Sequence, residues 1–490
     1  MTSAGVSDAV TSSPPPALSR ADRAVIGVLL VATFVVILNE TIMGVALPVL
    51  LTELDVTAAV GQWLTAGFLL TMSVVIPITG YLIQRVPTRV LYGVAMSLFS
   101  AGTLIAALAP GFAVLLAARV VQACGTAIML PLLMTTVMTL VPPARRGAVM
   151  GNISIVISVA PAIGPTVSGV VLDLFSWRAM FWVVLPISVT ALVLGLRWVT
   201  RIGESSSAPI DVLSVVLSVF GFGGLVYGLS SIGHSGGGSS AALWGSLAVG
   251  VLGIAAFVLR QVSLQRRERA LLDLRTFGFR SFTLASVLMM VMMGLLLGVV
   301  TILPIYTQNV LGLDPLATGL LLLPGGLLMG LLSPFVGRLY DRVGPRLLLI
   351  VGTIATSGSL WVATTFDAST SAVLVLVFHL ALSLGLAFSF TPLFSSGLGA
   401  LPARLYSHGS AIFSTTQQLA AAAGVALLVS VMSARAAGLA ASGESGVGAE
   451  MGGMHAAILL AAVLSLVAVA GAFLVQRGKA EAGPEGAAHV

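Results

Sequence analysis

The chain has 490 residues, of which 58% are hydrophobic and only 8% are charged, and its mean hydropathy is +1.09. Soluble domains carry about 25% charged residues, so a chain this apolar cannot cover its own surface in water, and its solvent must be largely lipid. The net charge of +6 does not indicate nucleic-acid binding, because the basic residues lie in small groups without interleaved aromatic residues. Cys124 is the only cysteine, which excludes an intramolecular disulfide and a thiol metal site; we expect no metal and no cofactor.

Fourteen apolar runs are long enough to cross a bilayer as helices, which takes about 20 residues. In chain order the predicted helices cover roughly 25–46, 61–83, 90–110, 112–136, 149–172, 179–199, 211–232, 241–260, 282–305, 316–337, 345–366, 371–396, 409–432 and 454–475. The segment before the first run lacks the charged-then-apolar order of a cleavable signal, so we expect that run to remain as a helix. The predicted fold class is an all-α polytopic membrane protein.

The basic residues test this helix count, because cytoplasmic loops carry an excess of Lys and Arg. One side of the predicted membrane holds 20 of the 23 basic residues: Arg20, Arg23, Arg85, Arg89, Arg145, Arg146, Arg197, Arg201, Arg260, Arg266, Arg267, Arg269, Arg275, Arg280, Arg338, Arg342, Arg346, Arg404, Arg477 and Lys479. The other side holds only Arg178 and Arg435, and Arg119 lies within a span. We therefore expect a multi-pass protein of the cytoplasmic (inner) cell membrane with both termini in the cytoplasm.

Two of the predicted cytoplasmic loops are alike. Residues 80–89 (GYLIQRVPTR) align with residues 337–346 (GRLYDRVGPR) without a gap, and five of the ten positions are identical. Each loop joins the second and third helices of a six-helix unit, and transporters are commonly built from two such halves with the substrate site between them. The predicted division is a disordered cytoplasmic tail (1–22), an N-terminal six-helix bundle (23–200), two inserted helices (201–262), a basic cytoplasmic linker (263–280), a C-terminal six-helix bundle (281–477) and a second tail (478–490).

These two loops suit a gating role. Gly80 and Gly337 allow two helix ends to approach closely, while Arg85 and Arg342 can satisfy helix C-terminal carbonyls and a facing acid. The alternative is that the arginines only anchor the topology.

Six segments carry recognisable motifs: 38–48 (LNETIMGVALP), 119–125 (RVVQACG), 164–169 (GPTVSG), 177–181, 303–308 and 337–346. They resemble motifs of the major facilitator superfamily, in particular of its fourteen-helix drug:proton antiporter family. The resemblance covers nearly all of the chain and implies two six-helix bundles, two inserted helices, an exporter driven by protons, and a gate that includes Asp341. With Glu40 where aspartate is commoner, and Gln84 at the acid position of the first loop, the chain looks most like the lincomycin-resistance branch. The first loop thus lacks the acid of a gating salt bridge.

Glu40 and Arg119 are the main candidates for proton coupling, because ionisable residues inside a bilayer are costly and usually functional. Each lies about six residues from the predicted outer end of its helix, which puts both roughly 9 Å below the outer surface, so the two can be partners. Desolvation favours the neutral acid and a nearby arginine favours the carboxylate. A carboxyl balanced between them can take up a proton outside and release it inside, while a cationic or polar substrate competes for it. The alternatives are a fixed Glu40–Arg119 pair, or an Arg119 that anchors carbonyls around Gly125 and the fifth span.

His379 is a further coupling candidate, because the repeat offset of 257 residues maps it onto Gln122, one turn from Arg119. Histidine changes charge near neutral pH and can relay protons; the alternative is a neutral side chain bonded to a nearby carbonyl. Gly164, Pro165 and Gly169 should kink the fifth helix and thin its face. Either they seal the fifth helix against the second half, or they provide ordinary close packing.

A substrate cavity would combine apolar walls with a few polar groups, and its predicted lining is Asn39, Trp63, Phe68, Gln122, Tyr306, Gln308, Gln417 and Gln418; packing or lipid contact is the alternative for each. We expect a proton-coupled antiporter that exports amphipathic drugs or other small molecules by alternating access. The alternative is an exporter dedicated to one endogenous metabolite, antibiotic or lipid. No phosphate-binding GxxxxGK[ST] loop supports an ATP-driven pump, and no catalytic constellation supports an enzyme. The expected partners are a small-molecule substrate, protons and the lipid bilayer, but no nucleic acid, and the chain should act as a monomer.

Overall fold

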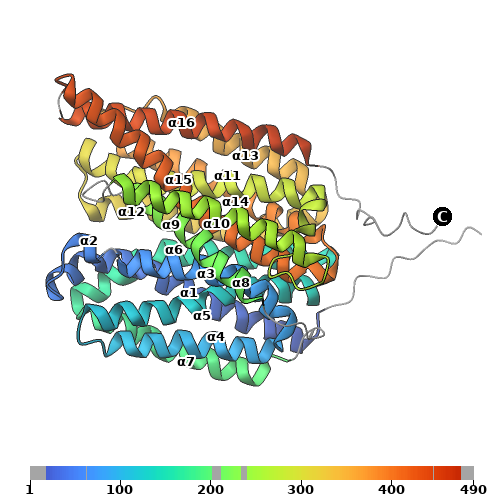
Figure 1. Ribbon diagram of the computed structural model, residues 1–490. Coiled ribbons are helices and arrows are strands. Elements are labelled where there is room, and N and C mark those ends of the chain that lie inside the picture. Colours follow the sequence, from blue (N-terminus) through green and yellow to red (C-terminus); the bar gives the residue numbers. More distant parts are fainter. Residues whose placement is uncertain (1–17, 62, 201–210, 233–239, 445, 476–490) are drawn as a thin grey trace, which may run out of the picture.

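The computed structural model describes residues 18–475 except residues 62, 201–210, 233–239 and 445 (Figure 1). Within this part of the chain, fourteen helical segments are long and apolar enough to cross a membrane, which confirms the predicted count. Helices suit lipid because every backbone polar group is satisfied within the segment. The predicted disordered tails lie largely outside the described residues, as do Arg201, Arg477 and Lys479.

The spanning helices form two six-helix bundles and an inserted pair. The first bundle holds α1 (Arg20–Glu53), α3 (Trp63–Arg85), α4 (Thr88–Ala107), α5 (Phe112–Leu140), α6 (Arg146–Leu174) and α7 (Trp177–Trp198). The last bundle holds α11 (Arg280–Ile305), α12 (Pro315–Val343), α13 (Pro345–Ala363), α14 (Ala372–Gly399), α15 (Tyr406–Ala441) and α16 (Gly446–Leu474). Figure 1 shows the first bundle below, the last bundle above, and the inserted helices in green across them.

Short elements complete the chain. They are α2 (Ala58–Gly61), the 3₁₀ turns η1 (Pro143–Arg145), η3 (Leu274–Gly278) and η5 (Ala403–Leu405), and the π-helical turns η2 (Val219–Gly223) and η4 (Tyr306–Val310). The π turn η2 joins α8 (Val212–Ser218) to α9 (Gly224–Ile232), so that these segments together cross the membrane once, beside α10 (Ser240–Gln265).

The first helix differs from its prediction at both ends. It begins at Arg20, where Ser19 accepts a hydrogen bond from the Asp22 N–H, so the predicted tail to residue 22 is three residues too long. At the other end α1 continues to Glu53, seven residues beyond the predicted end at Ala46. Glu40 therefore lies about 20 Å from the end of its helix rather than roughly 9 Å. The hydropathy pattern marks where a helix leaves the lipid, whereas the helix itself continues into a polar turn.

The internal repeat is visible in the helix bounds. Adding 257 to the bounds of α4 gives 345–364, and α13 spans Pro345–Ala363. The same offset carries α1 from 20–53 to 277–310, the region of α11 and η4. The two loops that are alike in sequence therefore occupy equivalent places in the two bundles.

The two bundles meet along α6 and α12, where small residues allow close approach. A Cβ atom added to Gly337 would lie 2.1 Å from the Gly147 carbonyl oxygen, and one added to Gly151 would lie 2.5 Å from the Ser333 carbonyl oxygen. Farther along the same pair, a Cβ on Gly326 would meet Ala162. Glycine at these positions thus brings the backbones of the two bundles into direct contact, as in other membrane helix pairs.

The inserted pair packs tightly and is held at one end by charge. Gly221 and Gly253 face each other so closely that a Cβ on either would collide with the other helix. Asp211 caps α8 through the Ser214 N–H and forms an ion pair with Arg260 at 2.8 Å. The first helix of the pair contacts α3 of the first bundle along its length, and its α9 segment also contacts α15 of the last bundle, so it spans the border between the bundles, while α10 packs on the first helix.

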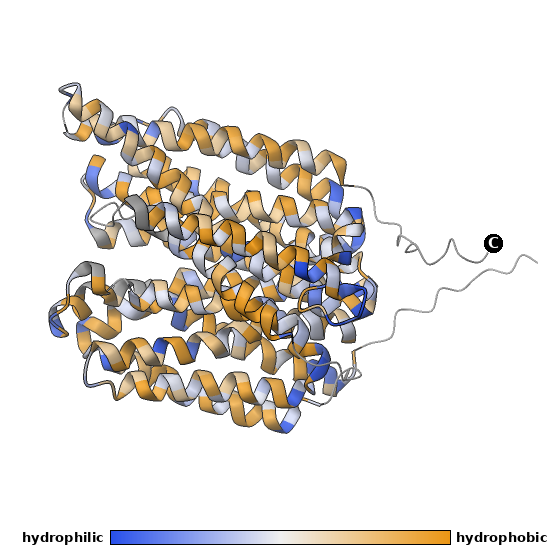
Figure 2. Ribbon diagram, viewed as in Figure 1, coloured by the Kyte–Doolittle hydropathy of each residue, from blue (hydrophilic) through white to orange (hydrophobic). Residues whose placement is uncertain are grey.

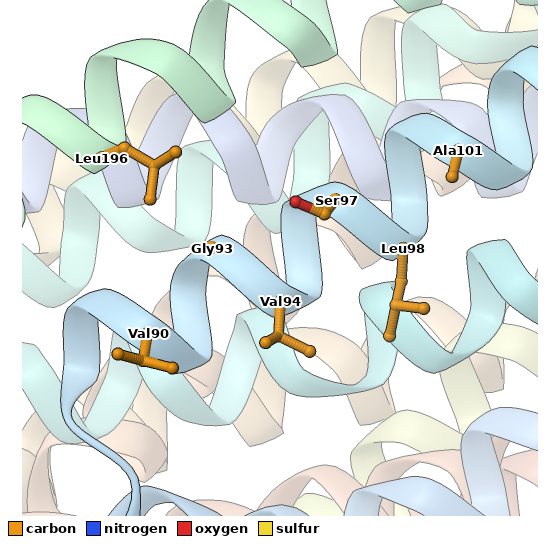
Figure 3. Close-up of a pocket in the computed structure, with 7 residues that line it drawn as sticks. All are labelled: Val90, Gly93, Val94, Ser97, Leu98, Ala101 and Leu196. Carbon is orange, nitrogen blue, oxygen red and sulfur yellow. The ribbon is translucent and has the colours of Figure 1, made fainter.

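Polar residues gather at one end of the molecule, shown as blue at the right of Figure 2. This is the end where α1 begins and α16 ends, and it holds the basic loops; we call it the basic end. Large apolar side chains are exposed along the flanks, as expected for a lipid-facing surface. One shallow groove of about 560 Å³ lies on such a flank, between Leu196 of α7 and Val90, Val94 and Leu98 of α4 (Figure 3). None of the predicted substrate residues lines it.

Candidate functional site

A buried arginine organises the polar interior of the first bundle. Arg119 of α5 is 1% exposed, and one terminal nitrogen donates to Asn39 Oδ1 of α1 and to Gln122 Oε1 of α5, each at 3.0 Å. Its guanidinium carbon lies 4.0 Å from the centre of the Phe68 ring of α3. Three helices thus supply neutral partners to one charge, with a cation–π contact besides. We call Asn39, Glu40, Phe68, Arg119 and Gln122 the α1–α5 polar cluster.

Glu40 belongs to this cluster but does not bond to the arginine. The described residues contain two ion pairs, Arg260–Asp211 and Arg275–Asp273, and Glu40 is in neither. Nor does its carboxylate form a hydrogen bond within the described part of the chain. The expectation that Glu40 and Arg119 lie close together agrees with the Asn39 contact one residue away, whereas the alternative of a fixed Glu40–Arg119 pair is not present here.

Arg119 also does not anchor the carbonyls around Gly125, the other alternative. Its Nε points to the Leu64 carbonyl oxygen in the second span, at 3.5 Å, a long contact. Gly125 instead packs on α4, where an added Cβ would lie 2.3 Å from the Ala95 carbonyl oxygen.

Two residues of α4 that the sequence did not single out hold the cluster in place. Thr103 accepts a hydrogen bond from Gln122 Nε2 at 2.9 Å, which orients the Gln122 amide so that its oxygen faces Arg119. Gly102 makes room for this arrangement, because a Cβ there would lie 2.8 Å from the Gln122 backbone nitrogen. A threonine and a glycine within an apolar span carry little sequence signal, which explains why both were missed.

The glycine motif of α6 contacts the same cluster from another side. A Cβ on Gly164 would lie 2.2 Å from Thr41 Oγ1, next to Glu40 on α1. Ser168 of the same helix donates to the Ile42 carbonyl oxygen at 3.0 Å. Gly164 therefore provides close packing within the first bundle, whereas a Cβ on Gly169 would meet nothing within 4 Å. The contacts of α6 with the second bundle come from other residues, and the side chain of Pro165 lies outside the described set.

At the basic end, Asp341 of α12 joins the two bundles. Its carboxylate accepts hydrogen bonds from the backbone N–H groups of Gly147, at 2.8 Å, and Ala148, at 2.9 Å, in the first turn of α6. An acid is favourable there because the first N–H groups of a helix have no partner within it and carry partial positive charge.

The equivalent contact on the other side of the repeat is weaker. Gln84 of α3 corresponds to Asp341, and its amide donates to the Arg404 carbonyl oxygen at 2.8 Å. Arg404 in turn corresponds to Gly147 by the repeat offset. Gly80 lies against α15 nearby, with an added Cβ 3.2 Å from the Ser407 carbonyl oxygen. Asp341 thus accepts two charge-assisted hydrogen bonds, whereas Gln84 makes one neutral hydrogen bond. Both contacts join the bundles and so close the basic end.

Known proteins resemble this chain in sequence and in fold. Residues 29–425 match the Major Facilitator Superfamily. The chain belongs to this superfamily. It is 44% identical over 444 residues to the MFS-type transporter YcnB of Bacillus subtilis, covering 90% of this chain and 93% of that protein. It is 41% identical to the lincomycin resistance protein LmrB of Listeria monocytogenes, covering 84% of this chain and 86% of that protein. The fold is similar to that of the human organic anion transporter MFSD10, with a TM-score of 0.66 at 15% identity over 94% of this chain and 100% of that one.

Membership of the superfamily makes the chain a multi-pass membrane transporter and not an enzyme, and it confirms the two bundles with two inserted helices. The likeness to a lincomycin resistance protein confirms the branch that the Glu40 and Gln84 positions indicated.

Within this major facilitator fold, four of the predicted cavity residues come together. Asn39, Phe68 and Gln122 surround Arg119, and Gln418 of α15 reaches across from the last bundle to Met72 Sδ at 3.7 Å. Met72 lies one turn from Phe68 in a small apolar cluster between α3 and α5. Through Met72, Gln418 of the last bundle thus contacts the apolar cluster that includes Phe68.

The other four predicted cavity residues lie elsewhere. Trp63 stacks on Tyr227 of the inserted α9, with ring centres 5.7 Å apart. The Tyr306 hydroxyl donates to the Asp367 carbonyl oxygen, and Gln308 is exposed in the same π turn. The Gln417 amide donates to the Phe413 carbonyl oxygen of its own helix. Their part in a cavity remains a prediction.

The remaining predicted residues have these surroundings. Nε2 of His379 lies 3.1 Å from the Leu322 carbonyl oxygen of α12, while its buried Nδ1 has no partner within the described residues. Arg85 lies over the ring of Tyr81 at 3.8 Å, and Arg342 is exposed at the basic end. The histidine contact is the one expected of a structural side chain, and a relay role remains a prediction.

Proposed function

We propose that this transporter is a proton-coupled antiporter that exports amphipathic drugs or other small molecules across the cytoplasmic membrane by alternating access. The observation that carries the proposal is the position of Glu40 and its lack of a bonding partner. Its carboxyl lies in a membrane-spanning helix beside a buried arginine, yet within the described residues it has neither an ion-pair nor a hydrogen-bond partner. A carboxyl without a fixed partner is free to bind a proton or a cationic group of the cargo.

The arginine makes this role possible because it stays charged without neutralising the acid. Arg119 is held by Asn39, Gln122 and the Phe68 ring, so its position does not depend on the charge of Glu40. Its field favours the carboxylate, while the surrounding apolar helices favour the neutral acid. In our proposal the proton binds from the outside, and cargo entering from the cytoplasm displaces it.

The energetics are adequate for export. A pH difference of one unit corresponds to about 1.36 kcal/mol for each proton, so the exchange of one proton for one neutral molecule can sustain an about tenfold concentration ratio. A membrane potential of 100 mV adds about 2.3 kcal/mol for each charge moved.

The similarity to a lincomycin resistance protein supports antibiotics of that kind as cargo. We further propose that the basic end faces the cytoplasm, because cytoplasmic loops are enriched in basic residues, and that a single chain is the functional unit.

The test is Glu40→Gln in proteoliposomes loaded with lincomycin, under an imposed pH gradient. Glutamine keeps the size of the side chain but cannot release a proton. We expect gradient-driven uphill transport to vanish, while exchange of lincomycin at equal pH on both sides continues. Glu40→Asp is the matched control and should retain driven transport. Driven transport by the glutamine variant at the wild-type rate would contradict the assignment of Glu40.

A further inference from the structure

A second polar site lies at the end of the molecule opposite the basic end. A hollow of about 460 Å³ is lined by Arg435 of α15, by His455, Ala456 and Leu459 of α16 and by Thr364 at the end of α13. Gly452 completes the lining, and no carboxylate belongs to it. The hollow belongs to the last bundle, whereas the α1–α5 polar cluster belongs to the first, and the proposed transport function does not use the hollow.

The basic side chain in this hollow, Arg435, has no hydrogen-bond or ion-pair partner among the described residues. Arg178 and Arg435 are the two basic residues predicted on this side of the membrane. Arg178 donates to the Ala109 carbonyl oxygen at 2.9 Å and lies over the Trp177 ring. Arg435 has no hydrogen bond or ion pair within the part of the chain that the structure describes, and neither has His455. Two side chains that can donate to an anion thus line one hollow, and neither donates to another of the described residues.

The depth of the hollow places it where lipid headgroups lie. Thr364 caps the C-terminal end of α13, so the chain leaves the membrane at this level. Trp361, one turn earlier, is 41% exposed, and tryptophan is enriched at membrane interfaces.

An apolar path leads from the hollow toward the middle of the membrane. Leu459 forms part of the lining, and Val463 and Val467 follow it at four-residue steps along α16. These three side chains are 48%, 48% and 51% exposed, so they form a continuous stripe on one face of the helix. A charged head above an apolar stripe is the pattern of a phospholipid.

We propose that this hollow binds the phosphate of an anionic phospholipid in the outer leaflet, with Arg435 and His455 as donors to the phosphate and the α16 stripe as the contact for an acyl chain. Charge-assisted hydrogen bonds to phosphate supply the affinity, and the apolar stripe distinguishes a lipid from free phosphate.

The test uses the purified full-length protein in dodecyl maltoside and measures its melting temperature as dioleoyl phosphatidylglycerol is added. A ligand that binds only the folded state stabilises it by RT ln(1 + [L]/Kd), so the melting temperature rises with ligand concentration and the rise is smaller when Kd is larger. The comparison arms are dioleoyl phosphatidylcholine and inorganic phosphate, each at the same concentration. The test variant combines Arg435→Gln with His455→Gln. The control variant is Arg89→Gln, which removes an exposed arginine at the basic end and so controls for loss of general attraction to anions.

We expect phosphatidylglycerol to raise the melting temperature of the wild type and of the Arg89→Gln protein. The double variant should bind it about tenfold more weakly or worse, as expected from the loss of a charge-assisted bond. Phosphatidylcholine and inorganic phosphate should have little effect. An equal shift with inorganic phosphate would overturn the lipid assignment, and an undiminished shift in the double variant would overturn the site itself. Neither result bears on Glu40.

Discussion

The contact between Asp341 and the start of α6 predicts that one substitution changes which end of the transporter is closed. The Asp341 carboxylate accepts from the Gly147 and Ala148 N–H groups, and these bonds join the two bundles at the basic end. They cannot persist when the bundles separate there. Replacing Asp341 by alanine therefore destabilises the conformation described here relative to one open at the basic end.

The magnitude follows from the two bonds. A hydrogen bond to a charged group contributes about 1.5–3 kcal/mol, and the lower value is appropriate because Asp341 is only half-buried. Two such bonds amount to about 3 kcal/mol. At 1.36 kcal/mol for each factor of ten, the ratio of open to closed populations at the basic end should rise about 100-fold.

Double electron–electron resonance can measure that ratio. Cys124 is the only cysteine, so a Cys124→Ala background leaves no native site for a spin label. Labels at Arg89→Cys and Arg346→Cys occupy equivalent exposed positions at the starts of α4 and α13, one in each bundle. Opening the basic end lengthens the distance between them, and Asp341→Ala should transfer population from the short to the long distance.

The repeat provides a matched comparison in Gln84→Ala. Gln84 makes one neutral hydrogen bond, to the Arg404 carbonyl oxygen, which contributes about 1 kcal/mol, so its loss should change the ratio only about fivefold. Equal effects of the two substitutions, or an unchanged distance distribution for Asp341→Ala, would refute the inference that the acid dominates closure.

Three further substitutions test the packing and the charges. Gly102→Ala should lower the stability of the detergent-solubilised protein by about 1–3 kcal/mol, because the new methyl group collides with the α5 backbone, whereas Gly169→Ala, with open space around it, should melt like the wild type. Asp211→Asn tests the inserted pair: hydrogen bonds from Arg260 lower the Asp211 pKa from its usual 3.8 to about 2, so the ion pair stabilises the fold above pH 4 and this contribution disappears as the pH falls toward 2. Since Arg260 is partly exposed, the variant should be less stable by about 1 kcal/mol between pH 5 and 8, and denaturation curves in which this gap widens on acidification would contradict the assignment. Finally, His379→Gln should retain gradient-driven transport, because glutamine can still donate to the Leu322 carbonyl oxygen; loss of driven transport with preserved exchange would instead assign His379 to the proton path.

The number of helices followed from the sequence because hydropathy directly reports the solvent of each segment. The positions of the helix ends were harder to predict from the sequence. The first helix extends to Glu53 because a helix need not stop where lipid stops, and hydropathy carries no information about that continuation.

The site was predicted in outline and missed in detail for a geometric reason. Adjacent residues on a helix point about 100° apart, so the sequence indicated that α1 and α5 carry ionisable residues at a shared depth but not which residue of α1 faces Arg119. The structure shows that Asn39 makes the bond and Glu40 does not. Thr103 was missed because a lone threonine gains its role only from the Gln122 amide opposite, a contact between distant positions.

The two halves of the repeat carry different acidic residues, and α6 contacts the surroundings of both. By the offset of 257, Glu40 corresponds to Leu297, so the second bundle has no acid at the equivalent place, whereas Asp341, the acid that joins the bundles at the basic end, belongs to the second bundle. These two groups meet the same helix. Gly147, at the start of α6, donates to Asp341, and Gly164, about 25 Å farther along, packs against Thr41 beside Glu40. Under the proposed function, a change in the charge or hydration of Glu40 that moves α1 against α6 acts on the helix whose first turn bonds to Asp341, and we propose this continuous helix as the route from proton binding to closure of the basic end.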